Sequence, residues 1–323
     1  MSGRALPDRA ESNKVRQVSV RQDRARTGGK MRIAALDIGG TAIKSGIWNG
    51  EALTELREWE TNASEGGKAL MERVKAILHT CKVFDAIGIS TAGQVNTEEG
   101  SIHYANDNIP GYTGMPVKKI LEQEFGVKAV VENDVKAAAL GEMYAGAAKG
   151  LSDFLCLTYG TGVGGAIIMG GKVQQGSSYA GGSFGGILVH PEDWRPEEVW
   201  SGCYEKYAST TALVRKAREI DPQLDNGRKI FGAMDRREVR QTVDGWIDEI
   251  VYGLVTLIHI FNPSHILLGG GIMAQPYVTE ETARRVRQRI APNMRHVSIG
   301  RTSLGNQAGL VGIASLAGGM LNP

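Results

Sequence analysis

The stretch TYGTGVGGAII, residues 158–168, places four glycines within eleven positions between two apolar runs. FLCLTY upstream has the composition of a buried strand, and GAIIMGGKV downstream is a short β-branched run. Gly160, Gly162 and Gly165 match G-x-G-x-x-G, but that pattern indicates a dinucleotide site only between a strand and a helix. The flanks therefore predict strand, glycine turn and strand. The hairpin either lines an anion pocket with backbone N–H groups or serves only the fold.

Length and composition point to an ordinary globular protein. The chain has 323 residues, 42% of them hydrophobic and 22% charged, and is long enough for two domains. No apolar run approaches the ~18 residues of a membrane helix, and the N-terminus has no apolar core of a secretory signal. We therefore expect a cytoplasmic protein with no membrane partner.

Charge is divided unevenly along the chain. Residues 1–30 hold eight Lys/Arg against three Asp/Glu, net +5, which leaves 29 against 32, net −3, for residues 31–323. A mildly acidic body argues against nucleic acid as a partner, because a domain-wide basic excess is typical of nucleic-acid binding. The extension has scarcely any apolar periodicity, and we expect it to be disordered. A phosphate-gripping arm is one interpretation of it; an unselected tail, or a true start at Met31, is favoured.

The cysteines and histidines indicate no metal site. Cys81, Cys156 and Cys203 lie far apart with no C-x-x-C pair, and the six histidines show no H-x-x-x-H spacing. Neither a disulfide framework nor a cysteine-rich zinc site is predicted.

The hydrophobic pattern from residue 31 onward predicts an α/β protein. The first half has strand patterns at RIAALDI, SGIW, LTELREWE and DAIGIS, a helix over about 67–79, and a strand VKAVVEND that runs into a helix from residue 135. Asp134 is thus expected at a helix N-terminus. The second half has helices around 209–220 and 239–261, a strand at HILLGGGI and two further helices. DIGGTAIKSGI and TYGTGVGGAII form one weak internal echo.

Phosphoryl transfer to a small alcohol needs backbone donors around the phosphates, a metal held by carboxylate or water, and a base at the hydroxyl. Asp37 ends a predicted strand directly before Gly39, Gly40 and Thr41. A carboxylate there can hold hydrated magnesium while the turn approaches the phosphates. For this motif alone, an acidic β-turn with no further role is an equal alternative.

Seven motifs follow one another in order: DIGGTAIK, GISTAGQV, DNIPGY, VVENDVKAAALGE, TYGTGVGGAI, ILLGGGI and AGLVGIASLA. Together they are far more specific than any one alone. The chain from residue 31 onward resembles the ROK family of bacterial sugar kinases, within the actin-like ATPase superfamily, and most of all its zinc-less β-glucoside kinase-like and glucokinase-like branch. The resemblance implies a two-lobed actin-like (ribonuclease H-like) α/β fold, in which ATP, Mg²⁺ and a sugar meet in the cleft between the lobes.

The resemblance also implies the domain organisation. A small N-terminal lobe is expected over 31–134 and a large C-terminal lobe over 135–306, after the extension 1–30. The final helix, 307–323, is expected to pack back on the first lobe. Dimers are common in the family, which implies a homodimer.

Carried over residue by residue, the resemblance assigns ATP binding to two phosphate loops and an adenosine-side loop. These loops comprise Asp37, Gly39, Gly40, Thr41 and Lys44; Thr158, Gly160, Thr161 and Gly162; and Gly269, Gly270 and Gly271. Asp37 is implied to hold Mg²⁺ through water. On this assignment the hairpin at 158–168 bends around phosphate oxygens.

Asn133 and Asp134 match the family's Asn-Asp pair. The resemblance implies that Asp134 takes the proton from the sugar 6-hydroxyl as it attacks the γ-phosphate, and general-base help of this kind is worth ~10²–10⁴ in rate. It implies that Asn133 binds a sugar hydroxyl and that Asn108 and Gly93 lie on the sugar side. Asn and Asp are also favoured helix caps, so capping is the alternative role for the pair.

The sequence departs from the family pattern at one segment. Many members carry G-E-x-G-H and then C-x-C-G-x-x-G-C-x-E, whose His and three Cys hold zinc. Here the first part is GGSFGG, with Ser183 at the Glu position and Gly186 at the His position, and only Cys203 of the three cysteines remains. His190 lies four residues late and is not expected to be a ligand. We expect no structural zinc, and a less charged sugar pocket with Ser183 facing C1 and C2.

The leading hypothesis is an ATP-dependent, Mg²⁺-requiring kinase for the 6-hydroxyl of a hexose or hexose derivative, glucokinase-like or β-glucoside kinase-like. N-acetylmannosamine kinase is an alternative. A sugar-sensing repressor, as the family also includes, would carry a helix-turn-helix, and the polar extension lacks the apolar positions to build one. An inactive sugar-binding protein is a third hypothesis, against which the intact Asp134 and phosphate loops argue.

Overall fold

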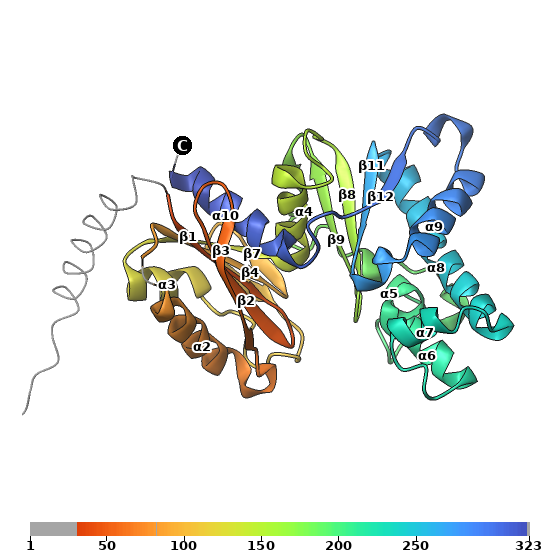
Figure 1. Cartoon of the computed structure of the whole chain (residues 1–323), viewed down its shortest axis with the longest axis horizontal. Helices are drawn as coiled ribbons and strands as arrows, with labels where there is room; N and C mark the ends of the chain where they lie inside the picture. Colours follow the sequence, from red (N-terminus) through yellow and green to blue (C-terminus); the bar gives the residue numbers. More distant parts are fainter. Residues whose placement is uncertain (1–30, 82, 322–323) are drawn as a thin grey trace, which may run out of the picture. The chain divides into compact units, whose positions relative to one another are not determined.

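The computed structural model describes residues 31–81 and 83–321, and the chain divides into two compact units (Figure 1). One unit runs to Tyr144 and resumes at Gln307, and the other spans Ala145–Asn306. The division falls after Tyr144, whereas the sequence analysis placed the lobe boundary after residue 134. The basic extension lies outside the described residues.

The first unit contains a five-stranded sheet of order β3-β2-β1-β4-β7. β1, β2 and β3 form an antiparallel meander, while β4 and β7 run parallel to β1. The strands are β1 (Ile33–Ile38), β2 (Ala42–Trp48), β3 (Leu53–Glu60), β4 (Ala86–Thr91) and β7 (Lys128–Asn133). Because parallel strands end at the same edge of a sheet, the carboxyl ends of β1, β4 and β7 lie together.

Helices cover both faces of this sheet (Figure 1). Alternate residues of β1 point to opposite faces: Leu36 joins the apolar cluster that includes side chains of α2 and α3, while Ile33 contacts α10 through Gly318. A small hairpin, β5–β6, completes the unit. The elements are α2 (Gly66–Thr80), β5 (Gln94–Asn96), β6 (Ser101–Tyr104), α3 (Val117–Phe125), α4 (Asp134–Ala145) and α10 (Ala308–Leu321), with a 3-10 turn η1 (Ala63–Glu65).

Helices α4 and α10 touch through glycines. A Cβ placed on Gly312 would lie 1.8 Å from the carbonyl oxygen of Ala137, and one on Gly141 would lie 2.2 Å from the carbonyl oxygen of Ala308. No side chain fits at either position, because real Cβ atoms do not approach backbone this closely. The glycines therefore set the distance between the helix that begins at Asp134 and the helix that covers β1 and β4.

The second unit repeats the sheet plan of the first. Its order is β10-β9-β8-β11-β12, with β8, β9 and β10 antiparallel and β11 and β12 parallel to β8. The strands are β8 (Phe154–Tyr159), β9 (Val163–Met169), β10 (Lys172–Val173), β11 (His265–Gly269) and β12 (Ser298–Arg301). The two stretches of the internal echo form the equivalent hairpins β1–β2 and β8–β9, and the predicted strand, glycine turn and strand at 158–168 is confirmed.

The core of the second unit is centred on the long helix α8 (Arg237–Phe261). Trp246 is fully buried, and its Nε1–H donates to the carbonyl oxygens of Ala208 and Ser209. The other helices are α5 (Tyr204–Ala208), α6 (Thr210–Ile220), α7 (Gly227–Gly232) and α9 (Pro276–Arg289), with 3-10 turns η2 (Phe184–Gly186), η3 (Pro191–Asp193), η4 (Gly271–Ala274), η5 (Pro292–Met294) and η6 (Gly305–Gln307). None of the helices in the described ranges is long and apolar enough to cross a bilayer.

Candidate active site

Three strand ends bring the polar residues of the first unit together. In the parallel pairing Asp37 of β1 lies opposite Ser90 of β4, and Thr91 of β4 lies opposite Asn133 of β7. Helix α4 begins at the next residue, Asp134. Three residues that lie up to 97 positions apart, Asp37, Asn133 and Asp134, therefore share one edge of the sheet.

Asp37 is a half-buried carboxylate held from two sides. The hydroxyl of Ser90, which is itself fully buried, donates to Asp37 Oδ1 at 2.6 Å. On the other side, a Cβ on Gly309 would lie 2.9 Å from the same oxygen, so the first turn of α10 approaches the carboxylate directly. Burial raises the pKa of Asp37, while the Ser90 hydrogen bond and the positive charge of Lys44 on β2 lower it. Cation binding would relieve the cost of burying this charge.

Asp134 has the properties of a base that works near neutral pH. Its Oδ1 accepts hydrogen bonds from the backbone N–H of Val135 (2.9 Å) and from Nδ2 of Asn133 (2.8 Å). Its pKa is raised to about 6, first by burial, which disfavours the charged form, and then by the negative charge of Asp37. Those two hydrogen bonds oppose the shift. A carboxyl group with this pKa can accept a proton from a hydroxyl and release it again.

Asn133 caps α4 and holds Asp134. Its Oδ1 accepts from the backbone N–H groups of Val135 (3.0 Å) and Lys136 (3.1 Å), which is the geometry of an N-cap. Its Nδ2 donates to Asp134 and to the carbonyl oxygen of Gly93 (3.0 Å). The capping alternative therefore describes what the Asn133 amide does in this structure, and the same amide orients the candidate base.

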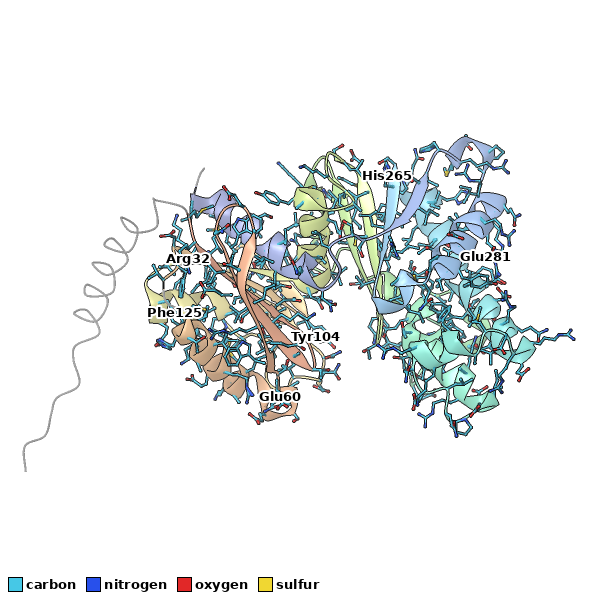
Figure 2. All side chains as sticks on the ribbon, viewed as in Figure 1. Arg32, Glu60, Tyr104, Phe125, His265 and Glu281 are labelled. Atoms are coloured by element: carbon cyan, nitrogen blue, oxygen red, sulfur yellow. The ribbon has the colours of Figure 1, made fainter. Side chains whose placement is uncertain are left out.

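Gly93 contacts Asn133 directly, whereas the hydrogen bond of Asn108 is to Asn106. Gly93 has a φ of +98°, and a Cβ there would lie 2.9 Å from the carbonyl oxygen of Tyr104, which Figure 2 labels. Glycine is required at this position because a side chain would be strained and crowded. Asn108 lies in an exposed turn after β6, where its backbone N–H donates to Oδ1 of Asn106 (3.3 Å).

The predicted phosphate loops are the tips of the two equivalent hairpins. In the first, the Gly39 N–H closes the turn on the carbonyl oxygen of Ala42 (3.0 Å), and the Thr61 hydroxyl donates to the Gly39 carbonyl (2.7 Å). Gly40 and Thr41, at its tip, are exposed. The loop is thus anchored from beneath while its tip faces outward.

The second loop is closed in a similar way. The Gly160 N–H donates to the Gly162 carbonyl (2.9 Å), and Gly160 and Thr161 are exposed. Thr158 pairs with Gly269 at the carboxyl ends of β8 and β11, and Gly270, with a φ of +104°, lies against the Tyr159 backbone. The structure therefore places the loop 269–271 directly beside this hairpin tip, and the role of both in nucleotide binding stays a prediction.

The sequence analysis did not single out Glu205, a half-buried carboxylate beside this second loop. Glu205 Oε2 accepts from the Val163 N–H (2.9 Å), and a Cβ on Gly162 would overlap that oxygen at 2.1 Å. Glu205 is the last residue of GCYE and so matches the final Glu of the family's G-C-x-E. This match to the final Glu is the signal in the sequence that indicates Glu205.

The segment around Ser183 is held by hydrogen bonds and packing. Ser183 is exposed, and its hydroxyl donates to the Ala180 carbonyl (2.7 Å), while Phe184 is buried. Cys203 Sγ contacts the Gly186 carbonyl oxygen at 3.5 Å. His190 lies between Glu192 (2.9 Å) and Glu249 (2.8 Å). Within residues 31–81 and 83–321, no group of three or more His, Cys, Asp or Glu is placed to hold a metal.

Comparison with known proteins places this geometry in a family. The model described as ROK family matches residues 33–319. A β-glucoside kinase from Listeria monocytogenes is 33% identical over 291 residues, which cover 87% of this chain and 96% of that protein. The solved structure of the Lmo2764 protein from L. monocytogenes has a TM-score of 0.82 at 30% identity and covers 90% of this chain and 100% of that one. A ROK family glucokinase from Streptomyces griseus, solved with glucose and AMPPNP, has a TM-score of 0.75 at 30% identity and covers 89% and 99%.

The fold and these relatives define the class as that of carbohydrate kinases, phosphotransferases with the two-lobed actin-like α/β fold. Both the fold class and the enzyme class predicted from the sequence are confirmed. The chain belongs to the ROK family.

Proposed function

We propose that this protein transfers the γ-phosphoryl group of ATP to the 6-hydroxyl of a hexose or hexose derivative. One observation carries the proposal: Asp134, with a pKa raised to about 6, stands at the strand edge beside Asp37. A base and a candidate magnesium-holding carboxylate within one group of residues are what phosphoryl transfer to an alcohol requires.

In the proposed reaction, an Asp134 carboxylate oxygen takes the proton of the sugar 6-hydroxyl. The hydroxyl oxygen forms a bond to the γ-phosphorus, and the bond from that phosphorus to the bridging oxygen of ADP breaks. Asn133 keeps the carboxylate oriented through its Nδ2–H bond. For Asn133 also to bind a sugar hydroxyl, that hydroxyl would replace one of its present partners.

Nucleotide contacts are assigned to three loops, each taken by itself. The exposed tips, Gly40 with Thr41 and Gly160 with Thr161, offer backbone to phosphate oxygens, and the loop 269–271 adjoins adenosine. Mg²⁺ would be held by Asp37, in part through water, because a hard cation with tightly bound water commonly uses one or two carboxylates plus phosphate oxygens. Bound there, it would neutralise charge on the phosphates.

We assign sugar contacts to Asn133, Gly93, Asn108 and Ser183. We add Glu205 because its carboxylate lies beside Gly185, in the same loop as Ser183. Glucose and β-glucosides are the first substrates to test, because the names of the relatives point to them. N-acetylmannosamine is the second, because the Lmo2764 structure is described as that of a candidate N-acetylmannosamine kinase. We further propose that the protein is a homodimer, that it binds neither nucleic acid nor membrane, and that it holds no structural zinc.

The test is a coupled ADP-release screen of the full chain with ATP and Mg²⁺ across glucose, mannose, N-acetylmannosamine, allose and β-glucosides. Turnover with one of these sugars and no turnover with its 6-deoxy analogue is the expected result, and phosphorus NMR of the product should place the phosphate on O6. A folded protein that releases no ADP with any of them would instead favour a sugar sensor.

A further inference from the structure

An exposed indole stands against the loop that departs from the family pattern. A Cβ placed on Gly186 would lie 3.3 Å from Cζ3 and 3.7 Å from Cη2 of Trp200, so the six-membered ring of the indole covers this glycine. The ring is brought there by the antiparallel bridge between Leu188 and Cys203, which closes the intervening segment on itself. Gly186 and Trp200 are thus neighbours although 14 positions separate them.

The preceding glycine of the loop contacts a carboxylate. A Cβ on Gly185 would lie 3.2 Å from Glu205 Oε2, the oxygen that accepts the Val163 N–H. Of the two adjacent glycines, Gly185 therefore lies beside the carboxylate of Glu205 and Gly186 beside the indole of Trp200.

The indole is open to a ligand. Trp200 is 48% exposed. Two charged groups near it in the chain are paired, since Lys206 Nζ contacts Glu198 Oε1 at 2.6 Å. The Ser201 hydroxyl is occupied by the backbone of Arg195 and Glu198. The exposed indole therefore offers a face on which an apolar or aromatic group can stack.

Three positions of the loop present no carboxylate. Position 183 carries a serine whose hydroxyl is turned back to the Ala180 carbonyl, and Gly185 and Gly186 have no side chains. A substituent on C1 of the sugar would meet no carboxylate at position 183. Glu205, on the other side, remains as the carboxylate beside the loop.

We propose that Trp200 binds the C1 substituent of a β-glucoside, so that the indole selects aryl and alkyl β-glucosides over free glucose. This inference rests on the proposed function for the location of the sugar. It adds a specificity residue and a substrate class: glucosides whose aglycone has an apolar face that can stack on an indole.

Binding is measured first, on the full chain carrying Asp134→Asn, so that turnover does not interfere. Phenyl β-glucoside and glucose are titrated by calorimetry into this protein and into versions that also carry Trp200→Ala or Trp200→Phe. Trp200→Ala should weaken phenyl β-glucoside about 3- to 10-fold, the loss expected for one aromatic contact, with little change for glucose. Trp200→Phe should recover part of the loss.

Trp194→Ala is the matched control. Trp194 lies on the same segment and is 54% exposed. None of its atoms is among those nearest to a Cβ placed on Gly186. Its removal should leave the ratio of the two affinities unchanged. An unchanged ratio in Trp200→Ala, an equal loss for both ligands, equal effects of the two tryptophans, or no binding of phenyl β-glucoside by folded protein would each overturn the proposal.

Two further measurements separate the alternatives. If light scattering shows that Trp200→Ala dissociates an assembly while the affinity ratio stays constant, the indole belongs to an interface between copies and the proposal fails. If the unaltered chain releases no ADP with any sugar but Trp200→Ala still changes the affinity ratio, the proposed function fails and the Trp200 site stands. If the unaltered chain phosphorylates glucose normally but Trp200→Ala leaves the affinity ratio unchanged, the proposed function stands and the Trp200 site fails.

Discussion

Asn133 donates a hydrogen bond from Nδ2 to Oδ1 of Asp134 at 2.8 Å, across the junction of β7 and α4. The same amide accepts from the first N–H groups of the helix, so its orientation is determined by the backbone. The candidate base is therefore held by a residue that is itself held by a helix N-terminus. This arrangement joins helix capping, the alternative role considered for the pair, to the proposed chemistry.

Asp134→Asn should remove most turnover and leave ATP affinity nearly intact. The asparagine Oδ1 can still accept the bonds from Val135 and Asn133, so the change removes the base and little else. We expect kcat to fall by ~10²–10⁴. Steady-state kinetics and nucleotide titration measure the two quantities, with Asp225→Asn, a change at an exposed ion pair with Lys229, as the control. Near-normal turnover would reduce Asp134 to a structural residue.

The pH dependence should report the same group. A base must be ionised to accept a proton, so kcat/KM should fall as pH drops through about 6, the raised pKa of Asp134. The profile is measured at saturating Mg²⁺ with ADP release as the signal. An acidic limb near 4, the ordinary range of an aspartate, would contradict the assignment.

The contribution of Asp134 to stability should fall as pH rises, whereas its contribution to kcat/KM should grow. Because the pKa of Asp134 is higher in the folded state than its ordinary value of 3.8, the folded chain binds this proton more tightly than the unfolded chain does. The stabilising contribution is full below about 3.8 and is lost as pH rises through about 6. Asp134→Asn should therefore raise the free energy of unfolding at pH 8 by ~1–3 kcal/mol and change it little at pH 4. Denaturant titrations at both pH values check this.

Substitution of Asn133 should separate capping from orientation of the base. Asn133→Ala removes the cap of α4 and should cost about 1 kcal/mol of stability as well as turnover. Asn133→Ser keeps an oxygen for the cap but loses the Nδ2–H bonds to Asp134 and Gly93. We expect the serine variant to regain most of the melting temperature but little of kcat. Equal recovery of both would show that the bond to Asp134 does not matter for turnover.

The contact between α4 and α10 should tolerate no side chain. Gly312→Ala places a Cβ 1.8 Å from the Ala137 carbonyl oxygen, so the helices must separate, and we expect a loss of ~1–3 kcal/mol. Gly319 is the matched control, because it is exposed in the same helix with nothing within 4 Å of its Cβ position. Gly319→Ala should stabilise by ~0.5–1 kcal/mol through helix propensity. Urea unfolding compares the two, and a stable Gly312→Ala protein would show that the helices do not pack this closely.

Ser183→Glu should restore a carboxylate at the loop and improve free glucose relative to C1-substituted sugars by ~1–3 kcal/mol in kcat/KM. Ser183→Ala is the control, since it removes only the hydroxyl bond to Ala180. Competition between glucose and methyl β-glucoside gives the ratio directly. A ratio that does not move would mean that position 183 does not face the sugar.

The local pattern of the sequence determined the secondary structure and much of the candidate site. Glycine turns between apolar runs predicted both hairpins, and β3 occupies LTELREWE, the stretch read as the third strand. Asp134 begins α4 at the expected place because the cap, the alanine-rich helix and the preceding strand are all signals within a few residues. Local preferences of the backbone are sufficient for such predictions.

Only the tertiary structure decided the surroundings of these residues. The pairing of β1 with β4 brings Ser90 to Asp37 across 53 positions, and no period in the sequence marks that pair. The raised pKa of Asp134 depends on burial and on the charge of Asp37, both of which arise only when three strands end together. Glu205 meets Gly162, and Trp200 meets Gly186, for the same reason. Spacing along a chain specifies local conformation, whereas charge, burial and contact depend on which distant segments pack against each other.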